Sequence, residues 1–118
     1  MVAYNFQQQF ATDVAALLKR QTIRAPGKDN GHAKKGDRLQ LYTGMRTKNC
    51  RKLVDPDPIC IASEPITLTV AGITYPENGK CMTPGIVAKR DGFPSYEAML
   101  EWFQKTHGLP FNGQLIRW

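Results

Sequence analysis

Two stretches of the chain carry apolar residues at the spacing of an amphipathic helix. The first lies between residues 5 and 19, with Asn5 as the expected N-cap, and its apolar positions are Phe6, Phe10, Val14, Leu17 and Leu18. The second lies near residues 95–107, where Ser95 is the expected N-cap and Gly108 follows the last turn. Both stripes predict helices that pack their apolar faces on a core.

Short runs of alternating or β-branched residues predict strands between and after these helices. They cover residues 21–24, 39–42, 59–62, 65–70, 72–75 and 115–118. Turn residues separate the runs, and the length of 118 residues indicates a single domain, 1–118. We therefore expect an α+β fold, mostly β, in which a small, mixed or mostly antiparallel barrel is flanked by two helices.

Composition narrows the class of protein. Hydrophobic residues make up 42% of the chain, which is enough for one core and excludes a disordered chain. The net charge of +6 favours a polyanionic partner, most simply nucleic acid. No apolar stretch approaches the roughly 18 residues of a membrane span, so no membrane partner is expected.

The cysteines and histidines point to neither a disulfide framework nor a metal centre. Cys50, Cys60 and Cys81 are an odd number at wide spacings, and the N-terminus lacks the pattern of a secretion signal. We expect three reduced thiols in a cytoplasmic protein. The two histidines, His32 and His107, lie far apart in sequence, so no zinc site is predicted, and no cofactor is expected.

A basic segment follows the run at residues 39–42. Tyr42 precedes four cations within seven residues, with no acid among them: Arg46, Lys48, Arg51 and Lys52. Cations beside hydroxyls and an aromatic ring suit a phosphate backbone and a stacked base. The alternative is an ordinary solvated loop.

The motif Lys19-x-x-Thr22-x-Arg24 joins the first helix to the first strand. In an extended run Thr22 and Arg24 share one face, and Ile23 points to the core. A bend at Lys19 would bring its amine toward the Thr22 hydroxyl, as in the base and nucleophile of a Ser–Lys pair. The alternative is a basic helix end, favoured by the helix dipole, followed by a strand.

Several stretches together resemble the ASCH family, whose domains have a PUA-like β-barrel. The resemblance includes Tyr4-Asn5-Phe6, the Lys19 motif, the run from Gly36 to Cys50 that contains Gly44-Met45-Arg46-Thr47-Lys48, and Asp91-Gly92-Phe93. It closes with Glu101-Trp102-Phe103 and Leu115-Ile116-x-Trp118, and is greatest to small, single-domain bacterial and phage members.

The resemblance implies RNA as a partner and, for one branch, hydrolysis of the amide of 4-acetylcytidine by a lysine, a threonine and a glutamate. Lys19 and Thr22 match the first two at the same spacing, and the glutamate position falls near Asp91, whose side chain is one methylene shorter. In that reaction Lys19 would take the Thr22 proton, and Thr22 would attack the acetyl carbonyl. Arg24 would hold a phosphate or the oxyanion, and Asp91 would protonate the leaving amine or bind the base edge.

Three interpretations follow. The first is an RNA- or nucleotide-binding module whose pocket combines the Lys19 motif with the basic segment. The second is an amidohydrolase acting on an acylated nucleoside through Lys19, Thr22 and Asp91. The third is a partner-binding barrel whose charge serves only solubility. In the first two, we expect Lys19, Thr22, Arg24 and Asp91 to line one pocket.

Overall fold

A computed structural model describes residues 2–26, 31–74 and 83–118 as a mixed α+β domain. Strands predominate, and no helix in these ranges is long and apolar enough to cross a lipid bilayer. The elements in chain order are β1 (Val2–Phe6), α1 (Gln8–Ala15), β2 (Gln21–Arg24), β3 (Leu39–Thr43), β4 (Arg51–Lys52), β5 (Ala62–Thr69), β6 (Gly72–Thr74), α2 (Pro84–Arg90), α3 (Tyr96–Thr106) and β7 (Phe111–Arg117).

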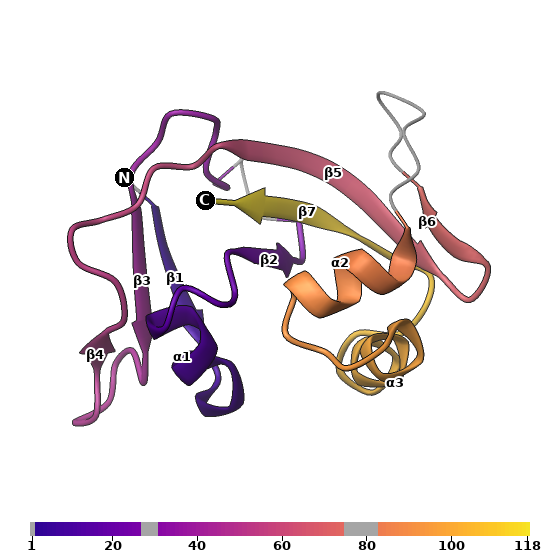
Figure 1. Ribbon diagram of the computed structural model, residues 1–118, viewed down its shortest axis with the longest axis horizontal. Helices are drawn as coiled ribbons and strands as arrows, with labels where there is room; N and C mark the ends of the chain where they lie inside the picture. Colours follow the sequence, from indigo (N-terminus) through magenta and orange to yellow (C-terminus); the bar gives the residue numbers. More distant parts are fainter. Residues whose placement is uncertain (1, 27–30, 75–82) are drawn as a thin grey trace.

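The strands form two sheets, which Figure 1 shows side by side. The first has the order β1-β3-β4, with β1 parallel to β3, and the second has the order β2-β7-β5-β6 with antiparallel pairs throughout. The segment before β5 connects them, because Cys60 N donates to Asp37 O and Ile61 N donates to Arg117 O, both at 2.8 Å. The strands β1 and β2 each lie at an edge, one in each sheet.

Two apolar clusters hold the domain together, and β7 contributes to both. Ile116 is buried with β1, β3 and α1, while Leu115 on the opposite face of β7 is buried with α2 and α3. Adjacent strand residues point to opposite faces, so a single strand can supply both cores. In Figure 1, α2 and α3 accordingly lie against the second sheet, and α1 lies beside β1 and β3.

The mixed α+β class and the helix near 95–107 are confirmed. The third helix, α3, spans Tyr96–Thr106, and the Ser95 side chain accepts a hydrogen bond from Ala98 N, as expected of an N-cap. The strand predicted at 21–24 is also found. Cys50 and Cys60 are free thiols, and Cys81 lies outside the described residues.

The predicted helix over residues 5–19 is wrong at both ends. Residues 2–6 form β1, in which Tyr4 and Phe6 are buried and alternate with exposed neighbours, so Asn5 lies in a strand and Gln7 precedes the helix. Leu17 and Leu18 lie beyond the helix and are exposed. The sequence pattern is ambiguous at Phe6. It fits the i, i+4 spacing of a helix with Phe10, and it also fits the alternation of a strand with Tyr4.

Two further boundaries differ from the prediction. The run at 65–70 falls mostly in β5, which begins at Ala62, the last residue of the predicted run 59–62, and in which Pro65 pairs with Gln114. Among the described residues β6 pairs with β5 only from Thr67 onward, so no described strand requires an N–H at Pro65. Residues 84–90, for which no helix was predicted, form a helix of their own, α2. No closed barrel is found among the residues described.

The turn after α1 places Lys19 and β2. Leu17 adopts a left-handed conformation with φ of 63°, Leu17 N donates to Val14 O, and Leu18 N donates to Asp13 O. This pattern is the Schellman motif, in which glycine is the favoured residue at the left-handed position. A leucine there carries a conformational cost of about 1–2 kcal/mol.

We expect Leu17→Gly to raise the free energy of unfolding by about 0.5–1 kcal/mol, because glycine relieves this cost and Leu17 buries little surface. Urea denaturation measures the change. The matched control is Leu18→Gly at the next exposed position, which should lower stability because glycine there only loosens the unfolded chain. Equal effects of the two substitutions would contradict the strained turn.

Candidate functional site

A cavity of about 540 Å³ opens where β1 and β2, the edge strands of the two sheets, face each other without a shared ladder. It lies within the size range of ligand pockets, roughly 300–1,000 Å³. Turns after α1 and α2 and the carboxyl-terminal half of α3 complete its walls. The lining includes all four residues expected to share one pocket: Lys19, Thr22, Arg24 and Asp91. The four residues share one cavity as expected, and their roles in binding or catalysis remain predictions.

A buried ion pair forms part of the wall of this pocket. Lys19 Nζ lies 3.1 Å from Asp91 Oδ1 and donates to the Asp91 carbonyl oxygen at 2.6 Å. The two residues are only 3% and 4% exposed. The pair therefore joins the turn that precedes β2 to the turn that follows α2, across 72 positions of sequence. Asp91 is thus a buried partner of Lys19 in the turn that precedes Gly92.

Burial and the attraction between the two charges shift the pKa values of Lys19 and Asp91 in opposite directions. Burial is the larger influence and lowers the pKa of Lys19, while the nearby Asp91 carboxylate raises it. Burial likewise raises the pKa of Asp91, and Lys19, Gln21 and Arg24 oppose that shift. A lysine whose pKa is lowered by burial gives up its proton more readily than an exposed lysine does.

Two neighbours fix the geometry of Asp91. Gln21 Nε2 donates to Val87 O at 3.1 Å and to Asp91 Oδ1 at 3.3 Å. Gly92 has φ of +96°, and a Cβ there would lie 3.3 Å from Phe10 Cδ1 and 3.6 Å from Lys19 Cδ. Glycine at position 92 therefore permits both the backbone turn and the close approach of Phe10 and Lys19.

Thr22 and Arg24 share one face of β2, as the alternation predicted. Arg24 Nε donates to Thr22 Oγ1 at 3.0 Å, and Arg24 Nη2 donates to Asn5 O at 2.7 Å. The guanidinium also lies 4.8 Å from the centre of the Phe6 ring, a cation–π contact. No direct hydrogen bond joins Lys19 to Thr22 within this structure; Lys19 is held by Asp91 and Thr22 by Arg24.

Aromatic residues that the sequence analysis assigned only to helix stripes or to the resemblance form another wall. Phe10, Phe93 and Trp102 all line the cavity, and their ring centroids are 5.4–5.9 Å apart. Helical spacing predicts only that Phe10 lies on the apolar face of its helix. It does not predict that rings from α1, from α3 and from the turn before α3 come into contact. Such rings can stack against a planar ligand.

His32 is a second feature that sequence reasoning did not assign to the site. His32 Nε2 lies 2.6 Å from the Ala25 carbonyl oxygen, which only accepts, so Nε2 carries the proton. His32 Nδ1 then accepts from the Tyr4 hydroxyl at 3.1 Å, and that hydroxyl accepts from Ala33 N. An imidazole oriented by these contacts therefore lines the pocket beside β1.

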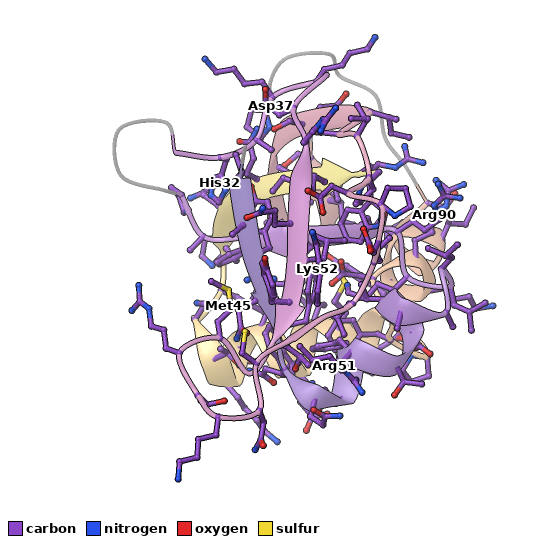
Figure 2. The ribbon with its side chains drawn as sticks, turned by 90° about the vertical axis from the view of Figure 1, so that its left-hand side faces the viewer. His32, Asp37, Met45, Arg51, Lys52 and Arg90 are labelled. Carbon is purple, nitrogen blue, oxygen red and sulfur yellow. The ribbon has the colours of Figure 1, made fainter. Side chains whose placement is uncertain are left out.

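The basic segment does not line this pocket. Arg46, Lys48, Arg51 and Lys52 are exposed, Tyr42 is half-buried, and Lys52 pairs with Asp57. Figure 2 shows Met45 and Arg51 at the lower end of β1 and β3. One contact reaches the pocket rim, because Met45 N donates to Asn5 Oδ1 at 2.9 Å and Asn5 lines the cavity.

The arrangement provides a proton acceptor, a hydroxyl, a guanidinium and a carboxyl group around an aromatic cavity. In residues 2–26, 31–74 and 83–118, no group of three His, Cys, Asp or Glu side chains is placed to hold a metal ion. The pocket is suited to organic ligands with a planar ring and polar edge groups.

The ion pair generates a stability prediction. We expect Lys19→Met and Asp91→Leu each to lower the free energy of unfolding by about 3–5 kcal/mol, because each leaves one buried charge without its partner. The double variant should lie within about 1–2 kcal/mol of the wild type, since it removes both desolvated charges. Urea denaturation of the four proteins gives the double-mutant cycle.

The control is the exposed pair of Lys105 and Glu101, whose side chains are 75% and 67% exposed. The cycle of Lys105→Met and Glu101→Leu should give a coupling of about 0.5 kcal/mol or less. Single variants at Lys19 and Asp91 that are as stable as the wild type would show that the pair is not buried in solution.

Comparisons with known proteins complete the description of the site. Neither a protein-family model, nor a curated protein, nor a solved structure was found to match the chain. The function is accordingly argued from the chemistry of the pocket.

Proposed function

We propose that the protein binds a nucleoside unit, free or within RNA, in the pocket between β1 and β2. The observation that carries this proposal is the combination of a wall of aromatic rings with buried polar groups in one cavity. A nucleobase presents both a flat face for stacking and an edge of donors and acceptors.

Each part of the base has a matching group. Phe10, Phe93 and Trp102 offer faces and edges for stacking. The Thr22 hydroxyl accepts from Arg24, which leaves its own hydrogen free for donation to the ligand. Asp91 accepts from a base amino group, and Arg24 at the rim faces the sugar or phosphate.

Two further parts of the proposal concern the type of fold and the binding of an RNA strand. We propose that the two sheets correspond to the PUA-like barrel that the sequence resemblance implies, opened between β1 and β2. The connection through residues 60 and 61 on the other side supports this correspondence. The exposed cations of residues 46–52 then extend the pocket into a track for an RNA backbone, attached to its rim through Asn5.

The test uses the four unphosphorylated nucleosides and the indole N–H signal of Trp102 in nuclear magnetic resonance. We expect at least one nucleoside to shift that signal, and Phe10→Leu to weaken its affinity by roughly fivefold or more because a stacking face is removed. Phe111→Leu is the matched control, since Phe111 is buried in the second core and does not line the pocket. No shift with any nucleoside, or equal losses of affinity for the two variants, would contradict the proposal.

The basic segment provides the control for RNA. Replacing Arg46, Lys48, Arg51 and Lys52 by alanine should leave nucleoside affinity unchanged, because none lines the pocket. For a single-stranded RNA, the removal of each phosphate-binding cation should flatten the log–log salt dependence of affinity by roughly 0.7. Equal slopes for wild type and variant would remove this segment from the RNA surface.

A second candidate function is hydrolysis of an acylated nucleoside such as 4-acetylcytidine. It is favoured by one observation, the lowered pKa of Lys19 in the pocket that also contains Thr22. Lys19 takes the Thr22 proton, Thr22 Oγ1 bonds to the acetyl carbon, and the carbon–nitrogen bond breaks as the amine takes a proton. Water then releases acetate from the threonine ester. The structure holds Lys19 on Asp91, so this path needs Lys19 to release Asp91.

Incubation with 4-acetylcytidine, followed by chromatography for free cytidine, tests the second function. We expect Thr22→Ala to abolish release while nucleoside binding persists, and Thr22→Ser to retain part of it. Asp91→Glu restores the longer acid that the resemblance implies and should raise the rate. The absence of cytidine from the wild-type reaction would leave only the binding function.

A further inference from the structure

A second concave site lies at the opposite end of β2 from Arg24. It is a cleft of about 390 Å³ where β2 begins, β7 ends and α2 ends. Three arginines line it: Arg20, Arg90 and Arg117. In Figure 2, Arg90 lies on the opposite side of the molecule from His32, which lines the first pocket. The two sites share no lining residue.

The charged side chains that line this cleft are all positive. No carboxylate side chain is among its lining residues, and within the described part of the chain none of the three arginines pairs with an Asp or Glu side chain. Arg20 Nε donates to Trp118 O at 3.2 Å, which fixes the Arg20 side chain. Three guanidinium groups around one hollow repel one another until an anion enters, and their planar forks match phosphate oxygens.

Two residues of the same lining each have a buried polar atom that has no hydrogen-bond partner within the described residues. Gln21 is 1% exposed, and its Oε1 accepts no hydrogen bond, although its Nε2 is bonded to Val87 and Asp91. Trp118 is 3% exposed, and its Nε1 donates to none of the groups described. A buried polar atom without a partner is costly, so a partner supplied by a ligand is favoured.

We propose that this cleft binds a phosphate ester that carries a neighbouring hydroxyl, as a nucleotide or an RNA strand does. The arginines hold the phosphate, the indole N–H of Trp118 donates to a phosphate oxygen, and Gln21 Oε1 accepts from the hydroxyl. Leu18 and Ile61, both exposed at the cleft, cover the apolar side of the sugar. The proposal for this cleft does not rest on nucleoside binding between β1 and β2.

The chain's two tryptophans separate the two sites, because Trp102 lines the first pocket and Trp118 lines the cleft. We expect cytidine 5′-monophosphate, or a single-stranded RNA of ten nucleotides, to shift the indole N–H signal of Trp118. Arg90→Gln/Arg117→Gln should weaken that binding by at least about tenfold. The matched control, Lys34→Gln/Lys35→Gln, removes the same charge from exposed positions and should leave the affinity unchanged.

Two comparisons distinguish the source and the chemistry of the ligand. Binding of the mononucleotide assigns the cleft to free nucleotides, whereas binding of the RNA alone assigns it to a strand. A DNA of the same sequence should bind more weakly than the RNA, because it lacks the 2′-hydroxyl that Gln21 accepts from. No shift of Trp118 with either probe, or equal losses of affinity in the arginine and lysine variants, would overturn the proposal whatever Trp102 reports.

Discussion

The ion pair between Lys19 and Asp91 is the constraint on which the rest of the site depends. It fastens the turn after α1 to the turn after α2, and these two helices belong to different apolar clusters. A buried pair of this kind contributes little net stability, since desolvation of both charges offsets their attraction. Apolar residues of similar volume would therefore hold these turns about as well.

The position of the pocket follows from the way the sheets end. Both β1 and β2 are edge strands, and the gap between them is closed by side chains instead of a ladder of backbone hydrogen bonds. Arg24 spans that gap by bonding Thr22 on its own strand and the Asn5 carbonyl on the other. An exposed strand edge can pair with another strand, but here the edges of β1 and β2 form the polar rim of an aromatic cavity.

Gln21 connects the two concave sites that we assign to ligands. Its amide nitrogen holds Asp91, which lines the first pocket, and the residue itself lines the arginine cleft. A ligand that engages its Oε1 would act on the residue that also positions Asp91, so Gln21 is the contact through which the two proposed sites would be coupled. Coupling of this kind requires differential contacts in each liganded state, which the two tryptophan signals can report separately.

The sequence by itself determined the local features of this protein. Alternation placed β2 and set Thr22 and Arg24 on one face, and Ser95 marked the start of α3, because these features depend on neighbours in the chain. Only the tertiary structure decided that residues 2–6 form a strand, since their pairing partner β3 is distant in sequence. It also decided the burial of Asp91 against Lys19 and the meeting of three arginines at the ends of β2, α2 and β7, because such contacts join distant segments and leave no periodic signal in sequence.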